Sequence, residues 1–554
     1  MELYGKSEKE MDIGFKRCGL VGLFALSVAW AWANRFVQDD AFISFRYARN
    51  LAQGNGLVWN IGERVEGYTN FLWTLCLAPS FLFGWEPVFY SYVLSLTAYV
   101  CTLVVSYGLA TTLWKTWKAG VLCVFLLATN FSFSSYATGG LETQFGIAWV
   151  MTAIGALEYW RRDQQRIALC IGAGLASAFA VMTRMDAILI LVPFWSVTVW
   201  RVWRTGLRRG WYMFGLAASM AAGPVFCWIL WRHAYYGAWL PNTFLIKSTG
   251  VSWIRGAYYV ALFYGVYGFW LAIPACWRCG RWLDKTPFVA GAAVAWVLWQ
   301  LYVVCIGGDF MEFRMMMPGL PLSCLFIAGL GRSDIVNKNA RRLLLAGLFF
   351  CSCLQGVCRF SYPGIQSIDE LKTCYQEWKE VASVINRQLG PDTQSVKIAV
   401  TAAGIIPYYT ACQTIDLLGL NDLEIAHSGE AIQAANRWLG NRPGHARIAK
   451  MKTVVERGVH LLFNKPWIVD GHETDVFKGT ACELCRTWSL GHGNEQNVHP
   501  IRVRFSCEPS LPVPRVVAWP VDGSRYLMSI YVTPCPAVDE AIKRSGALVI
   551  GERK

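Results

Sequence analysis

Two adjacent acids, Asp39 and Asp40, stand in the stretch RFVQDDAFISFRYARNLAQGNG, directly after an apolar run over residues 18–34. A positioned carboxylate can take a proton from a hydroxyl group, so this acid pair is a candidate for general-base chemistry. Helix capping is the simpler interpretation, because an acid before AFISFRYARNLAQ suits an N-cap and the helix dipole. Only one of the two acids can be the N-cap, which leaves the other without a local role.

Further ionisable residues stand beside apolar stretches in TRMDA (183–187), RHAYYGAWLPNTFLIKS (232–248) and GGDFMEFRMMMP (307–318). A guanidinium group such as that of Arg184 suits a phosphate, although an ion pair with Asp186 accounts for the same pattern. Basic and aromatic residues from Arg232 to Lys247 fit either a lipid-linked phosphate with a stacked sugar or anchors at the headgroup boundary. Gly307 and Gly308 allow either a close backbone approach or a tight turn.

The composition indicates a polytopic membrane protein. Of the 554 residues, 55 % are hydrophobic and only 16 % are charged, against about 25 % charged in soluble domains. Apolar stretches of about 15–25 residues, each able to cross a hydrocarbon core of about 30 Å, predict about eleven helices. The predicted spans are 18–34, 88–112, 119–136, 143–159, 167–183, 187–201, 211–231, 257–276, 287–306, 314–330 and 342–358. The first of them lacks a small-residue cleavage site, which predicts a retained helix.

Short loops rich in Lys and Arg predict the orientation of the chain. The net charge of +14 lies mostly in such loops, so it indicates topology and not nucleic-acid binding. These loops, near 115–118, 160–166, 201–210, 277–285 and 331–342, are predicted to be cytoplasmic, as is the N-terminus. FLWTLCLAPSFLFG (71–84) is short and contains Pro79, which favours an interfacial helix. With this topology, the remaining polar residues lie together at the outer ends of the helices. Ionisable groups at membrane depth tend to be functional.

The chain is predicted to divide into a transmembrane domain over 1–360, with an outer loop at 35–87, and a soluble α/β domain over 361–554 on the outer, periplasmic side of the membrane. Cys482, Cys485, Cys507 and Cys535 favour disulfides over a zinc site, because the spacing to the second pair does not fit a zinc ribbon. The sequence contains no Gly-rich phosphate loop, serine-nucleophile elbow or HExxH motif, so a nucleotide-dependent enzyme is poorly supported.

Six stretches together resemble a known family. They are 39–73, GGLETQ (139–144), TRMDA (183–187), YYGAWLPNTFLIK (235–247), GGDFMEFRMMMPGLP (307–321) and AAGIIPYYTACQTIDLLGLND (402–422). The chain resembles the GT-C type membrane glycosyltransferases, and more narrowly the cell-envelope arabinofuranosyltransferases that use polyprenyl-phosphate arabinose. Met185 stands where the family pattern has proline, and the region past Leu461 has no counterpart.

The resemblance implies transfer of a sugar from a polyprenyl-phosphate donor to a glycan or glycoprotein acceptor, without a nucleotide, at the outer face of a bacterial inner membrane. An aspartate of the first outer loop would be the base, with Asp40 preferred to Asp39. The residues expected at the donor phosphate are Arg184, Lys247, Arg314 and Arg232. Those expected at the sugar or acceptor are Glu66, Tyr68, Glu142, Tyr236, Asn242 and Asp309. In the outer domain, Asp416, Asn421 and Asp422 either help to hold the acceptor or end a strand.

Several alternatives stay open. A divalent cation at the acid pair is compatible with the sequence but not required by it. The donor sugar could be a hexose such as mannose. A transporter of lipid-linked sugars is another candidate, but transporters usually show internal repeats and polar groups near the membrane midplane, which are not seen here. A scaffold protein without catalytic activity is a further candidate.

Overall fold

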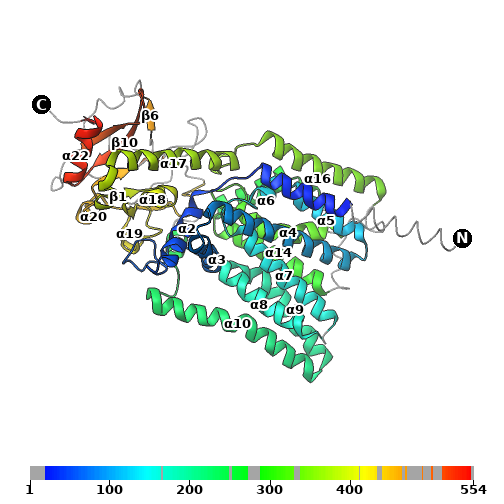
Figure 1. Cartoon of the computed structure of the whole chain (residues 1–554). Coiled ribbons are helices and arrows are strands. Elements are labelled where there is room, and N and C mark those ends of the chain that lie inside the picture. Colours follow the sequence, from blue (N-terminus) through cyan, green and yellow to red (C-terminus); the bar gives the residue numbers. More distant parts are fainter. Residues whose placement is uncertain are drawn as a thin grey trace.

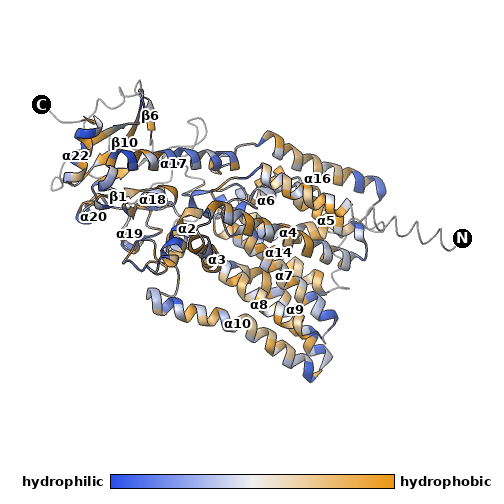
Figure 2. Cartoon of the chain, in the orientation of Figure 1, coloured by the Kyte–Doolittle hydropathy of each residue, from blue (hydrophilic) through white to orange (hydrophobic). Residues whose placement is uncertain are grey.

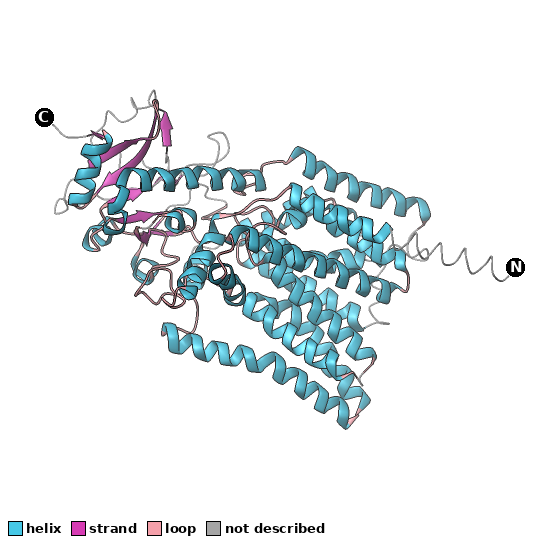
Figure 3. Ribbon diagram, in the orientation of Figure 1, coloured by secondary structure: helices cyan, strands magenta, loops and turns pink. Residues whose placement is uncertain are grey.

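The computed structural model describes residues 19–163, 166–248, 252–272, 287–329, 337–410, 412–432, 439–463, 468–470, 489–490, 501–502 and 515–550. A bundle of helices forms one part of the molecule, and strands are confined to the end that carries the C-terminal region (Figures 1 and 3). The predicted class, a helical membrane protein with a C-terminal α/β region, is confirmed.

Apolar helices form the bundle (Figure 2). Five helices in the described residues are long and apolar enough to cross a membrane: α4 (Pro87–Trp114), the helix Met185–Thr205, α10 (Arg208–Tyr236), α14 (Pro287–Cys305) and α16 (Lys338–Cys358). Shorter or less apolar helices complete the bundle: Gly19–Ala33, α5 (Trp117–Thr129), α6 (Phe131–Ser135), α7 (Thr143–Arg162), α8 (Ile167–Thr183), α12 (Trp253–Val266), η4 (Arg314–Gly319) and α15 (Leu320–Ala328). The chain is therefore a multi-pass membrane protein.

Each predicted span coincides with helix in the described residues, but two spans are interrupted. The stretch 119–136 breaks at Asn130, whose side-chain Oδ1 accepts a hydrogen bond from Phe133 N at 2.9 Å and caps a new helix, α6. Since a short polar side chain can satisfy free N–H groups at a helix start, Asn130 makes this break favourable inside the bundle. The predicted span 257–276 is described as α12 and the short helix η2 (Phe269–Ala272), and its last residues lie outside the described part.

The outer loop contains two helices that lie at the end of the bundle beside the C-terminal region (Figure 1). These are α2 (Asp39–Ala52) and α3 (Phe71–Leu82). At 12 residues α3 is about 18 Å long, too short to cross a bilayer, as predicted. Its Trp73 is fully buried and donates to the Gly140 carbonyl at 3.2 Å. A Cβ on Gly140, whose φ is +73°, would lie 2.8 Å from Ala41 Cβ, so glycine lets this loop pack directly on α2.

The C-terminal region is built on a seven-stranded mixed sheet with strand order β11-β9-β10-β5-β1-β2, in which β6 also pairs with β10. Strands β1 (Lys397–Val400), β2 (Gln413–Asp416) and β5 (Leu461–Phe463) are parallel, whereas β6 (Ile468–Asp470), β9 (Arg515–Pro520), β10 (Arg525–Tyr531) and β11 (Leu548–Ile550) pair antiparallel. Helices α17 (Ile368–Leu389), α18 (Ile405–Tyr409), α19 (Leu423–Ser428) and α22 (Pro536–Ser545) accompany the sheet.

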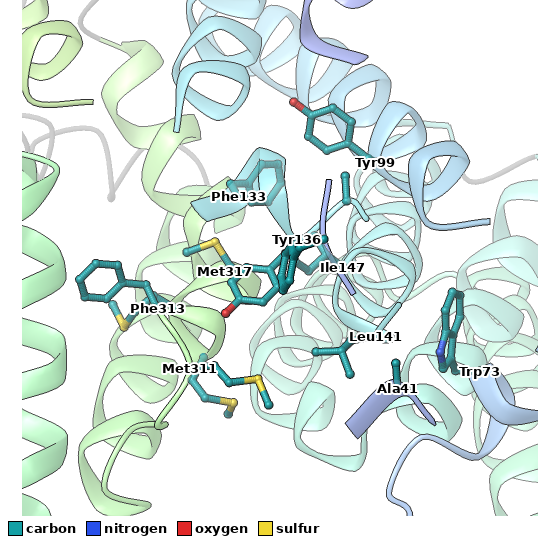
Figure 4. Close-up of a cluster of buried hydrophobic side chains, with 14 of the residues drawn as sticks. Ala41, Trp73, Tyr99, Phe133, Tyr136, Leu141, Ile147, Met311, Phe313 and Met317 are labelled. Carbon is teal, nitrogen blue, oxygen red and sulfur yellow. The ribbon is translucent and has the colours of Figure 1, made fainter. Parts of the chain in front are cut away.

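A continuous apolar core joins the outer loop to the bundle. Its buried side chains come from segments far apart in the sequence, as Figure 4 shows: Ala41, Trp73, Tyr99, Phe133, Tyr136, Leu141, Ile147, Met311, Phe313 and Met317. Burying apolar surface stabilises by roughly 25 cal/mol per Å², so this core holds the first outer loop firmly on the helix ends. Polar residues that stand above the core are thereby fixed in position.

Candidate active site

A cavity of about 730 Å³ lies where the loop region 35–87, the adjoining helix ends and the C-terminal region meet. Seven of the predicted site residues line it: Asp40, Tyr68, Glu142, Arg184, Lys247, Asp309 and Arg314. They come from α2, the loop before α3, the ends of α7 and α8, α11 (Asn242–Ser248) and the loop before η4. The structure therefore gathers in one place residues that are as far apart as 274 positions in the sequence, Asp40 and Arg314.

The carboxylate of Asp40 lines this cavity and, among the described residues, forms no hydrogen bond or ion pair. The N-cap of α2 is Gln38, whose side-chain oxygen accepts from Asp40 N, so both acids belong to the first helical turn. Burial raises the pKa of Asp40, and the cations Lys247 and Arg314 partly oppose that rise. A free carboxylate with a raised pKa, facing a cavity, has the properties of a general base.

Two cations face Asp40 across the cavity. Lys247, on α11, forms no hydrogen bond or ion pair in the described part of the chain, and burial lowers the pKa of its ammonium group. Arg314 donates through Nε to Asp309 Oδ2 at 2.6 Å, and its two terminal nitrogens make no hydrogen bond within the described residues. Both side chains thus keep donors available for an anion that enters the cavity.

Arg184, in contrast, is fully engaged in ion pairs. Its Nε and Nη2 donate to the two oxygens of Asp186 at 3.0 and 2.6 Å, and its Nη1 donates to Glu142 at 2.8 Å. Glu142 also accepts from Asn70 Nδ2 at 2.9 Å, and Tyr302 donates to Asp186 at 3.2 Å. The ion-pair interpretation of TRMDA therefore describes this arginine, which forms part of a fixed polar wall of the cavity.

Asp39 does not reach the cavity. Its carboxylate oxygens accept hydrogen bonds from Ile405 N at 2.6 Å and Gly404 N at 3.2 Å, at the start of α18. Burial raises the pKa of Asp39 to about 7. Its neighbours Arg46 and Arg49 donate to the carbonyls of Pro407 and Tyr408, at 2.6 and 3.0 Å. This face of α2 holds the C-terminal region in place.

Four more predicted site residues lie beside the cavity and not on its wall. Glu66 and Arg232 are both buried and form an ion pair at 3.5 Å. Burial raises the pKa of Glu66 to about 7, against the effect of Arg232. Tyr236 donates to the Leu57 carbonyl at 2.7 Å. Asn242 donates to the carbonyls of Gly419 and Leu420, at 2.7 and 3.0 Å, which ties α11 to the C-terminal region.

One side of the cavity is apolar and reaches the surface of the bundle. Ile188, at the start of α9 (Ile188–Thr205), and Phe244 on α11 both line the cavity, and they are 50 % and 51 % exposed. Cys305 and Ile306, at the end of α14, lie on the same cavity wall, and Cys305 is exposed. Since α9 and α14 belong to helices that are long and apolar enough to cross the membrane, this side offers an apolar chain a route from the lipid to the charged residues.

Sequence reasoning missed several residues of the wall. Ser44 and Asn70 hydrogen-bond to each other at 3.1 Å and continue the polar wall beyond Glu142. Ser44 lies one helical turn after Asp40, and Asn70 is the N-cap of α3. These two positions were the only signal in the sequence that Ser44 and Asn70 lie close together. Leu420 and Pro443, from the C-terminal region, also line the cavity. No sequence pattern indicated that these two apolar residues would lie near Asp40.

The remaining acids of the C-terminal region have structural contacts. Asp416 ends β2 and accepts from Leu418 N and Asn421 N, at 3.0 and 2.9 Å, and Asp422 caps α19. Among the described residues there is no group of three or more His, Cys, Asp or Glu side chains that could hold a metal ion. Cys535 is a buried free thiol, and Cys482, Cys485 and Cys507 lie outside the described residues.

The architecture is similar to that of known membrane enzymes. Crystal structures of ArnT from Cupriavidus metallidurans superpose with TM-scores of 0.57, in the complex with undecaprenyl phosphate, and 0.54, in the apo state. The alignments cover 92 % and 93 % of this chain and 98 % of the ArnT chain, at 12 % and 11 % identity. The chain therefore shares its fold with ArnT.

The chain is also similar in sequence to arabinofuranosyltransferases. The chain is 28 % identical over 353 residues to a terminal β-(1→2)-arabinofuranosyltransferase of Corynebacterium glutamicum, covering 55 % of this chain and 49 % of that protein. It is 28 % identical over 352 residues to the one of Mycobacterium tuberculosis, covering 54 % and 53 %. The chain spans about half the length of these relatives. Residues 368–497 match a domain of unknown function (DUF8728).

Proposed function

We propose that this chain is a glycosyltransferase that moves arabinofuranose from a polyprenyl-phosphate donor to a glycan or glycoprotein acceptor on the outer, periplasmic side of a bacterial inner membrane. The observation that carries the proposal is the unpaired carboxylate of Asp40, in a cavity that also holds two available cations and has an apolar side at the bundle surface. The similarity to arabinofuranosyltransferases supports the choice of sugar, and the ArnT complex with undecaprenyl phosphate supports the class of donor.

In the proposed reaction, Asp40 takes the proton of an acceptor hydroxyl group. The hydroxyl oxygen attacks the anomeric carbon and forms the new glycosidic bond, while the bond from that carbon to the phosphate oxygen breaks. The electron pair leaves with the polyprenyl phosphate. Lys247 and the free nitrogens of Arg314 stabilise the negative charge that develops there, which is where preorganised cations contribute most to the rate. The polyprenyl chain would lie along Ile188, Phe244 and Ile306.

The polar wall gives the reaction its geometry. Arg184, neutralised by two carboxylates, orients Glu142 and Asp186 toward the cavity, and Ser44 and Asn70 extend this line of groups toward Asp40. Such fixed hydrogen-bonding groups suit the hydroxyl groups of a sugar. Glu66, Arg232, Tyr236 and Asn242 support the wall from behind.

The test is turnover by the purified protein in detergent, with polyprenyl-phosphate arabinofuranose and polyprenyl-phosphate mannose offered in parallel to a panel of short glycan acceptors. Acceptor-dependent release of polyprenyl phosphate from the arabinose donor supports the proposal. Release of polyprenyl phosphate from the mannose donor alone would show that the transferred sugar is a hexose and not arabinose. Tight binding of both donors without turnover would favour a transporter of lipid-linked sugars.

A further inference from the structure

Two buried arginines meet at the junction between the bundle and the C-terminal region. Arg255, in the first turn of α12, is 4 % exposed, and Arg442, in the loop before β4 (Arg447–Ile448), is 8 % exposed. A Cβ on Gly364 would lie 3.3 Å from Arg255 Nη1 and 3.7 Å from Leu439 Cδ1, so the loop that carries Arg442 passes beside Arg255. The loop of Arg442 adjoins the cavity, since the next residue, Pro443, lines its wall.

Arg442 has no partner among the described residues. Its guanidinium group forms no hydrogen bond and no ion pair there, and burial, with a further contribution from Arg255, lowers its pKa to about 10. The acid that most favours its charge is Glu370, which already accepts from Ser367 N, at 3.3 Å, at the start of α17. A buried charge without a partner is unfavourable by several kcal/mol in ordinary protein interiors.

Arg255 is only partly satisfied. Its Nη2 donates to the carbonyls of Gly364 and Asp309, at 2.7 and 3.3 Å, but its Nε is buried without a hydrogen-bond partner, and the side chain is in no ion pair within the described part of the chain. The carboxylate of Asp309 is committed to Arg314 at 2.6 Å. Both guanidinium groups therefore keep unused donors, and neither forms an ion pair within the described residues.

The surrounding contacts keep this arrangement fixed. The ring of His445 lies 5.4 Å from the ring of Phe310, and a Cβ on Gly444 would lie 3.8 Å from Lys247 Cγ. Burial and the charge of Arg442 lower the pKa of His445 to about 4, so this histidine adds no positive charge at neutral pH. The loop is thus packed between α11 and the turn at 308–310.

We propose that Arg255 and Arg442 form a binding site for a phosphate or carboxylate group, next to the cavity but separate from its cations. Such an oxyanion would accept hydrogen bonds from both guanidinium groups and remove their repulsion. The site goes beyond the proposed function, which assigns the donor phosphate to Lys247 and Arg314. The oxyanion could belong to a soluble ligand or to a phospholipid headgroup, because Trp253, two residues before Arg255, is 67 % exposed.

The test is thermal unfolding of the full chain in a neutral detergent, with chloride replaced by inorganic phosphate at constant ionic strength. We expect phosphate to raise the Tm of the wild type by about 3 °C and to leave that of Arg442→Gln unchanged. In chloride alone, Arg442→Gln should be at least as stable as the wild type, because it removes an unpaired buried charge. A parallel series in phosphatidylglycerol and phosphatidylcholine nanodiscs tests the headgroup as the source.

Two control variants distinguish this site from the cavity and from a general effect of surface charge. Lys452→Gln removes an exposed charge of the same region, whose ion pair with Glu456 spans 3.9 Å, and should keep the phosphate response. Lys247→Gln tests the cavity. A response lost in Lys247→Gln but kept in Arg442→Gln would overturn the proposal, as would no response to phosphate or to phosphatidylglycerol. A response to phosphatidylglycerol alone, lost in Arg442→Gln, supports the site with a lipid headgroup as its ligand. Because the readout is stability, the outcome does not depend on glycosyl transfer.

Discussion

Asp39 and Asp40 are neighbours in the sequence, but their side chains lie on different faces of α2. The carboxylate of Asp39 accepts hydrogen bonds from Ile405 N and Gly404 N, at 2.6 and 3.2 Å, whereas the carboxylate of Asp40 faces the cavity without a partner in the described residues. Successive residues on an α-helix point about 100° apart, so one acid can hold the C-terminal region while the other stays free for chemistry.

Asp39→Asn tests the docking role through pH. The pKa of Asp39 in the folded protein, raised by burial to about 7, exceeds its ordinary value of 3.8, so the folded state keeps a proton that the unfolded chain releases between these values. Ionisation therefore costs the wild type stability as pH rises through about 7. Asparagine stays neutral at every pH, so the stability of Asp39→Asn relative to the wild type should rise by about 4 kcal/mol between about pH 4 and pH 7. Unfolding midpoints of the two proteins that run parallel across this range would contradict this role.

Lys247→Gln tests the proposed contact with the departing phosphate. Removing one preorganised charge from such a position typically costs about 3 kcal/mol, so we expect kcat/KM to fall by about 100-fold. Binding of polyprenyl phosphate, measured by calorimetry, should weaken in the same variant. The exposed Lys452 offers a matched Lys→Gln control. Unchanged turnover and unchanged binding of polyprenyl phosphate would remove Lys247 from the site.

The acidic side of the pH–rate profile tests the environment of Asp40. Burial raises its pKa above 3.8, while Lys247 and Arg314 lower it and Asp309 and Glu142 raise it further. A base must be deprotonated to act, so kcat/KM should be lost, as pH falls, at a pH above the ordinary aspartate value. Lys247→Gln removes a cation that favours the carboxylate, so the normalised profile should move to higher pH. A profile that does not move in Lys247→Gln would show that another group controls activity.

The orientation in the membrane can be tested with an epitope inserted at exposed turns. We expect an epitope after Gly54, in the outer loop, to be detected on spheroplasts that have an intact inner membrane. An epitope after Gly206, between α9 and α10, should be detected only after permeabilisation. Both glycines have a positive φ, +80° and +63°, in exposed turns, so the two insertions are structurally matched. The reverse pattern would place the cavity on the cytoplasmic side.

The sequence predicted the helices better than their interruptions. Apolar length identifies a segment that can cross a membrane, and α4, α10 and α14 lie where that pattern placed them. The break at Asn130 depends on one hydrogen bond from Phe133 N, which hydropathy does not detect. The number of membrane crossings is therefore harder to predict from the sequence than the fold class.

For the site, the pattern predicted which stretches come together but not which side chain faces the cavity. The buried ion pair of Glu66 with Arg232 does not line the cavity, whereas Tyr68, two residues after Glu66, does. Pro443 and Leu420 reach the cavity through the docking of a region that starts more than 300 residues after Asp40. Such long-range contacts depend on the tertiary packing of α2 against α18, which no local pattern encodes.

The most direct test of Asp40 as the base is the single-turnover rate of sugar transfer by Asp40→Asn, compared with its neighbour Asp39→Asn under the same conditions. Loss of a general base costs about 10²–10⁴-fold, so Asp40→Asn should fall by that factor while its Tm and its binding of polyprenyl phosphate stay near those of the wild type. Asp39→Asn should keep transfer within about tenfold of wild type, because its carboxylate contacts only the backbone of α18. Transfer by Asp40→Asn at the wild-type rate would contradict the assignment.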